Sequence, residues 1–102
     1  MKKKFLMILV GEGDRHGDLP LYEAVIRKLV QLGASGATVQ AGIMGFGSHH
    51  QIHTKRLFGI SDDRPISIAV IEDEAKIREV LLPAVRPMLS EGLVFMVDAE
   101  VL

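Results

Sequence analysis

Residues 4–10 read Lys-Phe-Leu-Met-Ile-Leu-Val, and this run is the clearest indication of the fold. A short, uninterrupted apolar run between charged residues predicts a central strand of a sheet. It is far shorter than the 18 or so residues of a membrane span. The three lysines before it mimic a signal peptide, but the charged residues 11–15 follow with no small-residue cleavage site. We therefore expect a first strand and not a signal.

A helix is predicted after this strand and the polar loop that follows it. Asp18 is a candidate N-cap, and Pro20 falls in the first turn, where its missing N–H costs little. Gly33 is placed to end the helix. Apolar residues recur between them at helical spacing: Leu21, Tyr22, Val25, Ile26, Leu29 and Leu32.

Three further elements complete the pattern. Residues 37–43 and 66–70 alternate apolar and small or polar side chains, which predicts two strands. Asp73 is expected to cap a second helix, which Pro83 should end or kink. Residues 93–101 alternate again and predict a fourth strand.

The predicted order is βαββαβ over one domain, residues 1–102. Two split βαβ units on one four-stranded antiparallel sheet form an α+β, ferredoxin-like sandwich with helices on one face. The other face must then be polar, liganded or covered by a partner. Enough apolar residues fall on it that we expect self-association.

Composition excludes several classes of function. Twelve basic and 13 acidic residues give a net charge of −1, which argues against a nucleic-acid binder. There is no cysteine, so disulfides, thiol chemistry and zinc-thiolate sites are ruled out. We expect a cytoplasmic protein that is not inserted in a membrane. No catalytic constellation emerges, and we expect no enzyme.

Residues 42–56 carry the strongest signal for a binding site. Backbone N–H groups in glycine-rich loops can cradle anions, and histidine, lysine and arginine can bind phosphate, carboxylate or, for histidine, metal. The candidate ligand-binding residues of this loop are Gly42, Met44, Gly45, Phe46, Gly47, His49, His50, His53, Lys55 and Arg56.

Each of these signals has an alternative. The glycines can be bulge or turn residues leaving the second strand, since their spacing fits neither a Walker loop nor a dinucleotide fingerprint. His49 and His53 are spaced as zinc ligands on a helical turn, yet no acidic residue lies nearby in the sequence. Met44 and Phe46 can stack on an adenine ring or anchor the loop.

The chain resembles the small PII-like branch known as domain of unknown function 190 (DUF190), within the PII signal-transduction superfamily. The resemblance spans nearly the whole chain. It is carried by Gly11-Glu12, Pro20-Leu21-Tyr22-Glu23, Gly33 with residues 36–39, Gly42-Ile43-Met44-Gly45-Phe46-Gly47 running on to His53, and Gly92-Leu93-Val94-Phe95.

The resemblance implies a homotrimer that binds an adenine nucleotide or similar anion between subunits. It places residues 44–47 and the following cations at one wall of the cleft, and Arg86 with the turn at Gly92 at another. The 43–60 loop would contact a partner, such as a membrane transporter or channel. No other cofactor is implied.

The chain also departs from true PII proteins. Its loop is shorter and lacks their modifiable tyrosine, and it stops at Leu102 without their basic C-terminal extension. We therefore expect a smaller ligand than the ATP and 2-oxoglutarate of true PII sensors. The alternative is a metal-binding trimer resembling the divalent-cation-tolerance proteins, with the loop histidines as ligands.

Overall fold

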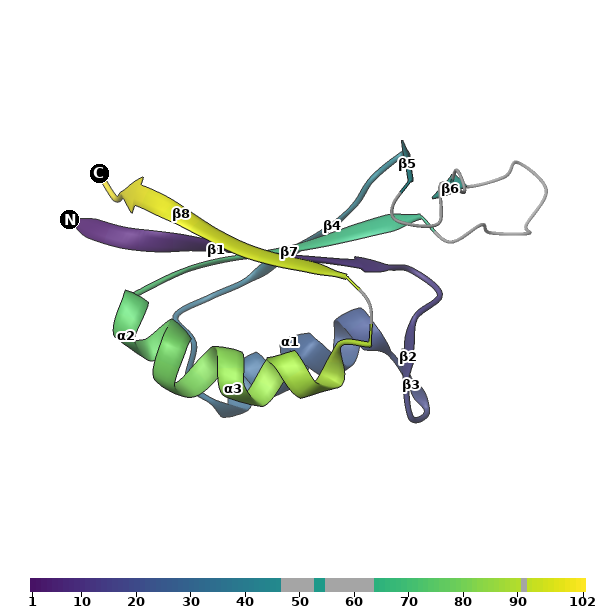
Figure 1. Cartoon of the computed structure of the whole chain (residues 1–102), viewed down its shortest axis with the longest axis horizontal. Coiled ribbons are helices and arrows are strands. Elements are labelled where there is room, and N and C mark those ends of the chain that lie inside the picture. The colour runs from purple at the N-terminus through teal and green to yellow at the C-terminus, as the bar shows by residue number, and fades with distance from the viewer. Residues whose placement is uncertain (47–52, 55–63, 91) are drawn as a thin grey trace.

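A four-stranded antiparallel sheet forms the centre of the molecule (Figure 1). The structure, a computed structural model, describes residues 1–46, 53–54, 64–90 and 92–102. β1 (Lys2–Gly11) lies between β7 (Pro65–Glu72) and β8 (Leu93–Glu100), and β4 (Thr38–Ala41) pairs with the far side of β7. The order β4-β7-β1-β8 is that of the predicted ferredoxin-like α+β fold, which is confirmed.

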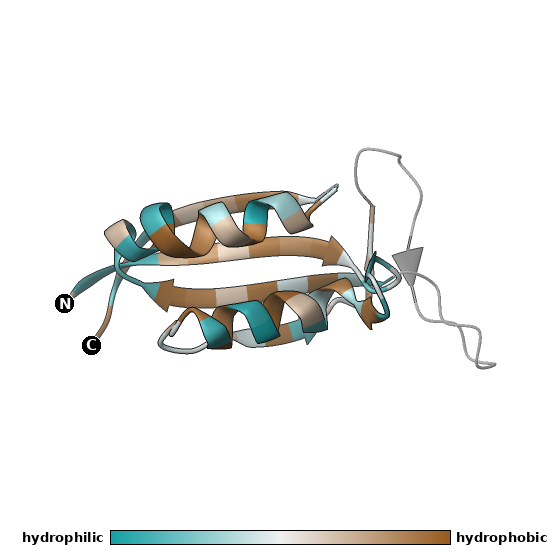
Figure 2. Ribbon diagram, turned by 90° about the horizontal axis from the view of Figure 1, so that it is seen from below, coloured by the Kyte–Doolittle hydropathy of each residue, from teal (hydrophilic) through white to brown (hydrophobic). Residues whose placement is uncertain are grey.

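Two helical segments cover one face of this sheet. The first is α1 (Leu21–Gln31). The second runs through α2 (Glu74–Lys76), the π-helical turn η1 (Ile77–Leu81), α3 (Leu82–Val85) and the 3₁₀ turn η2 (Arg86–Met88). Figure 2 shows them side by side across the sheet, with hydrophilic and hydrophobic residues alternating along each.

Two small hairpins extend from the sheet. β2 (Arg15–His16) pairs with β3 (Leu19–Pro20) directly before α1. β5 (Met44–Gly45) pairs with β6 (His53–Thr54) after β4.

The core follows from strand periodicity, because successive side chains point to opposite faces of a sheet. Leu6, Ile8 and Val10 of β1 and Ile66, Ile68 and Val70 of β7 are buried under the helices. Burial of each of these apolar side chains stabilises the fold by roughly 1.5–3 kcal/mol. The buried apolar residues are Leu6, Ile8, Val10, Leu21, Ala24, Val25, Leu29, Ile66, Ile68, Val70, Ile77, Leu81, Val85 and Leu89.

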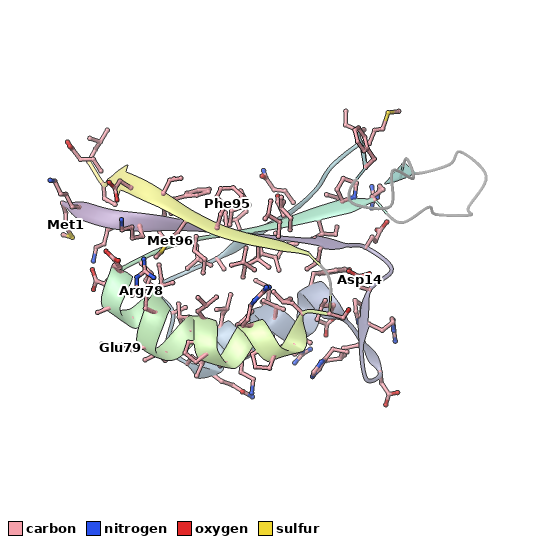
Figure 3. All side chains as sticks on the ribbon, viewed as in Figure 1. Met1, Asp14, Arg78, Glu79, Phe95 and Met96 are labelled. Carbon is pink, nitrogen blue, oxygen red and sulfur yellow. The ribbon has the colours of Figure 1, made fainter. Side chains whose placement is uncertain are left out.

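The opposite, open face of the sheet is also apolar. On β8, Phe95 points away from the helices while Met96 points toward them (Figure 3). Leu93, Phe95 and Val97 are 55%, 41% and 50% exposed. They stand beside Leu9, Met7 and Phe5 of β1, which are half-buried.

Of the two effects predicted for Pro83, ending or kinking the second helix, the first is wrong. The helix does not end at Pro83 but continues to Met88. Proline lacks an N–H and its ring crowds the carbonyl four residues earlier. The wider π turn, Ile77–Leu81, lies directly before Pro83 and accommodates both defects.

The expected helix caps are also corrected. The residue at the N-cap of α1 is Pro20, not Asp18, and no side chain caps this helix. Asp73 does stand at the N-cap of α2, but its side chain makes no cap hydrogen bond there. Its carboxylate instead accepts a hydrogen bond from Lys3 Nζ at 2.6 Å.

The second strand is shorter than predicted. β4 ends at Ala41, and Ile43, expected on its buried face, lies outside the strand and is 88% exposed.

Glu72 is a buried carboxylate at the end of β7. Its side chain is on the helix face of β7, where the residue is 7% exposed. Its Oε2 accepts a hydrogen bond from the backbone N–H of Ser35 at 2.9 Å. The Ser35 hydroxyl donates to the carbonyl of Ile71. Hydrogen bonding by Ser35 lowers the pKa of Glu72. This carboxylate therefore fixes the turn between α1 and β4.

Replacing Glu72 by Gln should lower the free energy of unfolding by about 1 kcal/mol at pH 7. The folded-state pKa lies below the ordinary value of 4.5, so the carboxylate stabilises the fold above that pH. Its contribution disappears as the pH falls through the folded-state pKa. Urea unfolding should therefore show a smaller difference in the free energy of unfolding between wild type and Glu72→Gln below pH 4 than at pH 7. The exposed Glu79→Gln variant serves as the control, and an equal effect there would contradict the assignment.

Gly92 directly precedes β8, and its backbone conformation explains why glycine stands there. Its φ is +124°, a conformation that favours glycine. A Cβ built on it would lie 2.5 Å from the carbonyl oxygen of Leu9. Close passage against β1 therefore requires glycine here.

Gly92→Ala should destabilise the fold by about 2 kcal/mol or more, because it combines a strained φ with overlap against backbone. Gly36→Ala is the matched control. A Cβ at Gly36 meets nothing within 4 Å, and its unfolding energy should change by less than about 0.5 kcal/mol. Denaturant unfolding of both variants measures the difference, and equal midpoints would refute the backbone explanation.

Candidate functional site

The loops with binding signals meet at one end of the sheet. Gly11 of β1 pairs with Pro65 of β7, and Leu9 pairs with Leu93 of β8. The chain therefore leaves β1, enters β7 and enters β8 at the same end. Both chain termini lie at the opposite end (Figure 1).

Pro65 forms the base of the 43–60 loop. The N–H of Gly42 donates to the carbonyl of Pro65 at 2.6 Å. A Cβ on Gly42 would lie 2.7 Å from Cγ of Pro65, and one on Gly45 would lie 3.1 Å from the same atom. These two glycines thus let the outgoing chain pass over the proline ring. In the described part of the loop, Gly42 and Gly45 therefore permit close packing against Pro65.

An ion pair lies beside this loop base. Arg64 Nε donates to Oε1 of Glu12 at 3.0 Å, and a terminal nitrogen of Arg64 donates to Oε2 at 2.7 Å. The backbone N–H of Glu12 also donates to the carbonyl of Arg64 at 2.8 Å. Each side chain is 24% exposed. Hydrogen bonding to Glu12 raises the pKa of Arg64, so this guanidinium stays charged.

The segment that carries Glu12 is itself anchored. Oδ2 of Asp14 accepts from the N–H of Gly11 at 2.9 Å. The carbonyl of Asp14 accepts from the N–H of Leu21 at 2.7 Å, which ties the turn to the start of α1. Figure 3 labels Asp14 where β1 turns toward the β2–β3 hairpin.

The described candidate ligand residues form two separate walls. Met44 and Phe46 are 64% and 69% exposed, and β5 rises from the open side of the sheet (Figure 1). Arg86 is exposed in η2, in the helix layer on the other side. Gly92 lies between these layers, against β1. Within one chain, the described parts of the two walls therefore do not close one cleft.

Several predicted site residues lie outside the described residues. They are Gly47, His49, His50, Lys55 and Arg56. The backbone of His53 is described as part of β6. Among the residues that the structure describes, no group of three or more His, Asp or Glu side chains is arranged to hold a metal ion.

A groove lies at the opposite end of the sheet from the base of the 43–60 loop. It is lined by residues of β1, β8 and α2, including Lys3, Lys4 and Asp98. Lys3 pairs with Asp73 at 2.6 Å, and Lys4 pairs with both Asp98 and Glu74. Lys3 and Lys4 are therefore already paired with carboxylates in this groove.

Sequence reasoning missed the pairing of Glu12 with Arg64. Glu12 lies in the polar loop after the first predicted strand, Arg64 precedes the strand predicted at 66–70, and 52 positions separate the two residues. The one available signal was that both positions flank predicted strands that are neighbours in the ferredoxin-like topology.

Solved structures of similar proteins agree with this fold. CPII from Thiomonas intermedia K12 is a nitrogen regulatory PII-like protein solved bound to ADP, AMP and bicarbonate. It is 25% identical, with a TM-score of 0.74, over 99% of this chain and 89% of CPII. CPII bound to ADP, AMP and acetate gives 26% identity and a TM-score of 0.68, over 98% of this chain and 88% of that chain.

No helix among the described residues is long and apolar enough to cross a membrane.

Curated relatives match over the same full length. A UPF0166 protein of Aquifex aeolicus (strain VF5) is 29% identical over all of this chain and 95% of the relative. The UPF0166 protein MJ1524 of Methanocaldococcus jannaschii is 31% identical over 99% of this chain and 93% of the relative. The profile of the DUF190 family, described as "Uncharacterized ACR", matches residues 3–101. This chain therefore belongs to the DUF190 family, and its fold is PII-like.

Proposed function

We propose that this chain is a PII-like regulatory protein that binds an adenine nucleotide between the subunits of a homotrimer. Residues 44–46 would form one wall of each cleft. Arg86 and the turn before Gly92 would form the other, contributed by a neighbouring subunit. The proposal assigns binding and signalling to the chain, with no catalytic step.

One observation carries this proposal. The chain matches CPII over nearly its whole length, and CPII was solved with ADP, AMP and bicarbonate bound. CPII is thus a structural relative whose ligands have the chemistry that the family resemblance implied, an adenine ring with anionic phosphate. Exposed Met44 and Phe46 can stack on such a ring, and exposed Arg86 can pair with phosphate.

The separation of the two walls supports an intersubunit site. β5 and η2 lie on opposite sides of the sheet in one chain. A neighbour that packs against the open face can bring a second wall to residues 44–46, which a single chain does not provide among the described residues. This geometry favours a nucleotide site that forms only when the subunits assemble.

The apolar open face supports the assembly itself. Leu93, Phe95 and Val97 leave about half of their surface in contact with solvent on one strand. A contiguous exposed apolar patch of this kind marks an interaction surface. Packing against other copies of the chain would remove it from water.

The 43–60 loop is the segment that we propose to contact a protein partner, such as a transporter or channel. Of this loop the structure describes residues 43–46 and 53–54. Ile43, Met44 and Phe46 at its start are strongly exposed apolar side chains.

Isothermal titration calorimetry with AMP, ADP, ATP and bicarbonate tests the ligand. We expect saturable binding of an adenine nucleotide. Arg86→Gln should weaken it by about tenfold, because one charge-assisted contact to phosphate is lost. Arg78→Gln is the matched control, since Arg78 pairs with Glu74 at the opposite end of the sheet. The absence of any nucleotide binding would overturn the proposed function. Equal affinities for both variants would remove Arg86 from the site.

Val97→Asp should convert the trimer to monomers, because a charge would be buried on the open face. Light scattering after size-exclusion chromatography should show one third of the wild-type mass. Val30→Asp is the control, because Val30 is 74% exposed on α1. Circular dichroism establishes that both variants fold. A monomeric wild type, or a Val97→Asp trimer, would contradict this interface.

A further inference from the structure

The Glu12–Arg64 pair connects three separate parts of the chain at the loop base. Glu12 follows β1, Arg64 precedes β7, and the next residue, Pro65, packs against Gly42 and Gly45. Any shift of Arg64 is therefore passed to Pro65 through one peptide unit, and from Pro65 to the two glycines. Gly45 lies between Met44 and Phe46, so this path ends at the proposed adenine wall.

The geometry of the pair suits it to holding a position. Two parallel N–H···O bonds and one backbone hydrogen bond join the same two residues, which fixes orientation as well as distance. The side of Glu12 is anchored through Asp14 to both Gly11 and the start of α1. One partner thus belongs to a fixed turn and the other to the loop base.

We propose that Glu12 and Arg64 are positioning residues for the nucleotide site, holding Pro65 and thereby residues 42–46 in the geometry that binds the ligand. This inference rests on the proposed function. Neither residue needs to touch the nucleotide. Breaking the pair would leave the sheet and core intact but allow the loop base to shift, because buried residues such as Ile66 and Val10 secure the strands independently.

Two single variants and one control test the proposal. Glu12→Gln removes the carboxylate charge, and Arg64→Lys keeps a cation but cannot form the two-bond fork. Each should weaken AMP or ADP binding about fivefold to tenfold by calorimetry. Glu23→Gln removes another Glu–Arg pair, the one with Arg27 on the surface of α1, and should leave the affinity unchanged. The double variant Glu12→Gln/Arg64→Lys should be no weaker than the worse single variant, since the pair acts as one unit.

A ligand-free measurement separates this inference from the proposed function. In ¹⁵N-correlation spectra, the amide resonances of Gly42 and Gly45 should move in Glu12→Gln and Arg64→Lys but not in Glu23→Gln. Thermal unfolding must show that each variant is folded at the titration temperature. If Glu12→Gln does not fold, Arg64→Lys decides alone.

The possible outcomes are distinct. Wild-type protein that binds no nucleotide ends the proposed function, whereas Gly42 and Gly45 resonances that do not move in either variant overturn the positioning of the loop base by the Glu12–Arg64 pair. Wild-type affinity in both variants overturns the positioning role and leaves the nucleotide site standing. Additive losses in the double variant would also overturn it, because they would mean that the two residues act separately.

Discussion

The structure depends on the antiparallel pairing of β1 with two neighbours at once. β7 and β8 both align with β1 along its length, so one strand determines the register of the three longest strands of the sheet. Its alternate residues Leu6, Ile8 and Val10 are buried under the helices, while Phe5, Met7 and Leu9 lie on the open face. A shift of one residue would exchange these two faces and expose the core.

The same register determines where function can reside. Because β1 ends opposite the start of both β7 and β8, three loops meet at one end of the sheet. Gly92 closes that end by passing against the carbonyl of Leu9, and Pro65 closes it against Gly42. Two of the glycines that suggested a phosphate cradle, Gly42 and Gly45, pack closely against Pro65. This packing places Met44 and Phe46 beyond the edge of the sheet, where they are exposed.

Much of the fold could be predicted because its signals are local. The apolar run of β1, the helical spacing of α1 and the alternation of β7 each lie within a few residues. Continuation of the second helix past Pro83 was not predicted, because the π turn that accommodates this proline depends on tertiary packing of Ile77 and Leu81, both fully buried. Asp18 misled because the N-cap depends on where the short β2–β3 hairpin ends. The Glu12–Arg64 pair could not be read from either segment alone, since strand register brings the two together.

The candidate site was less predictable than the fold, because its two walls lie on opposite sides of the sheet in one chain. The family resemblance implied a cleft between residues 44–47 and Arg86 with Gly92, without indicating that the sheet stands between residues 44–46 and Arg86 in one chain. If these walls meet only across subunits, ligand binding and assembly are linked equilibria. A nucleotide that binds the trimer alone then stabilises the trimer by mass action. The exposed apolar residues of β8 would therefore contribute to ligand affinity without contacting the ligand, because they determine how much of the chain is in the binding-competent form.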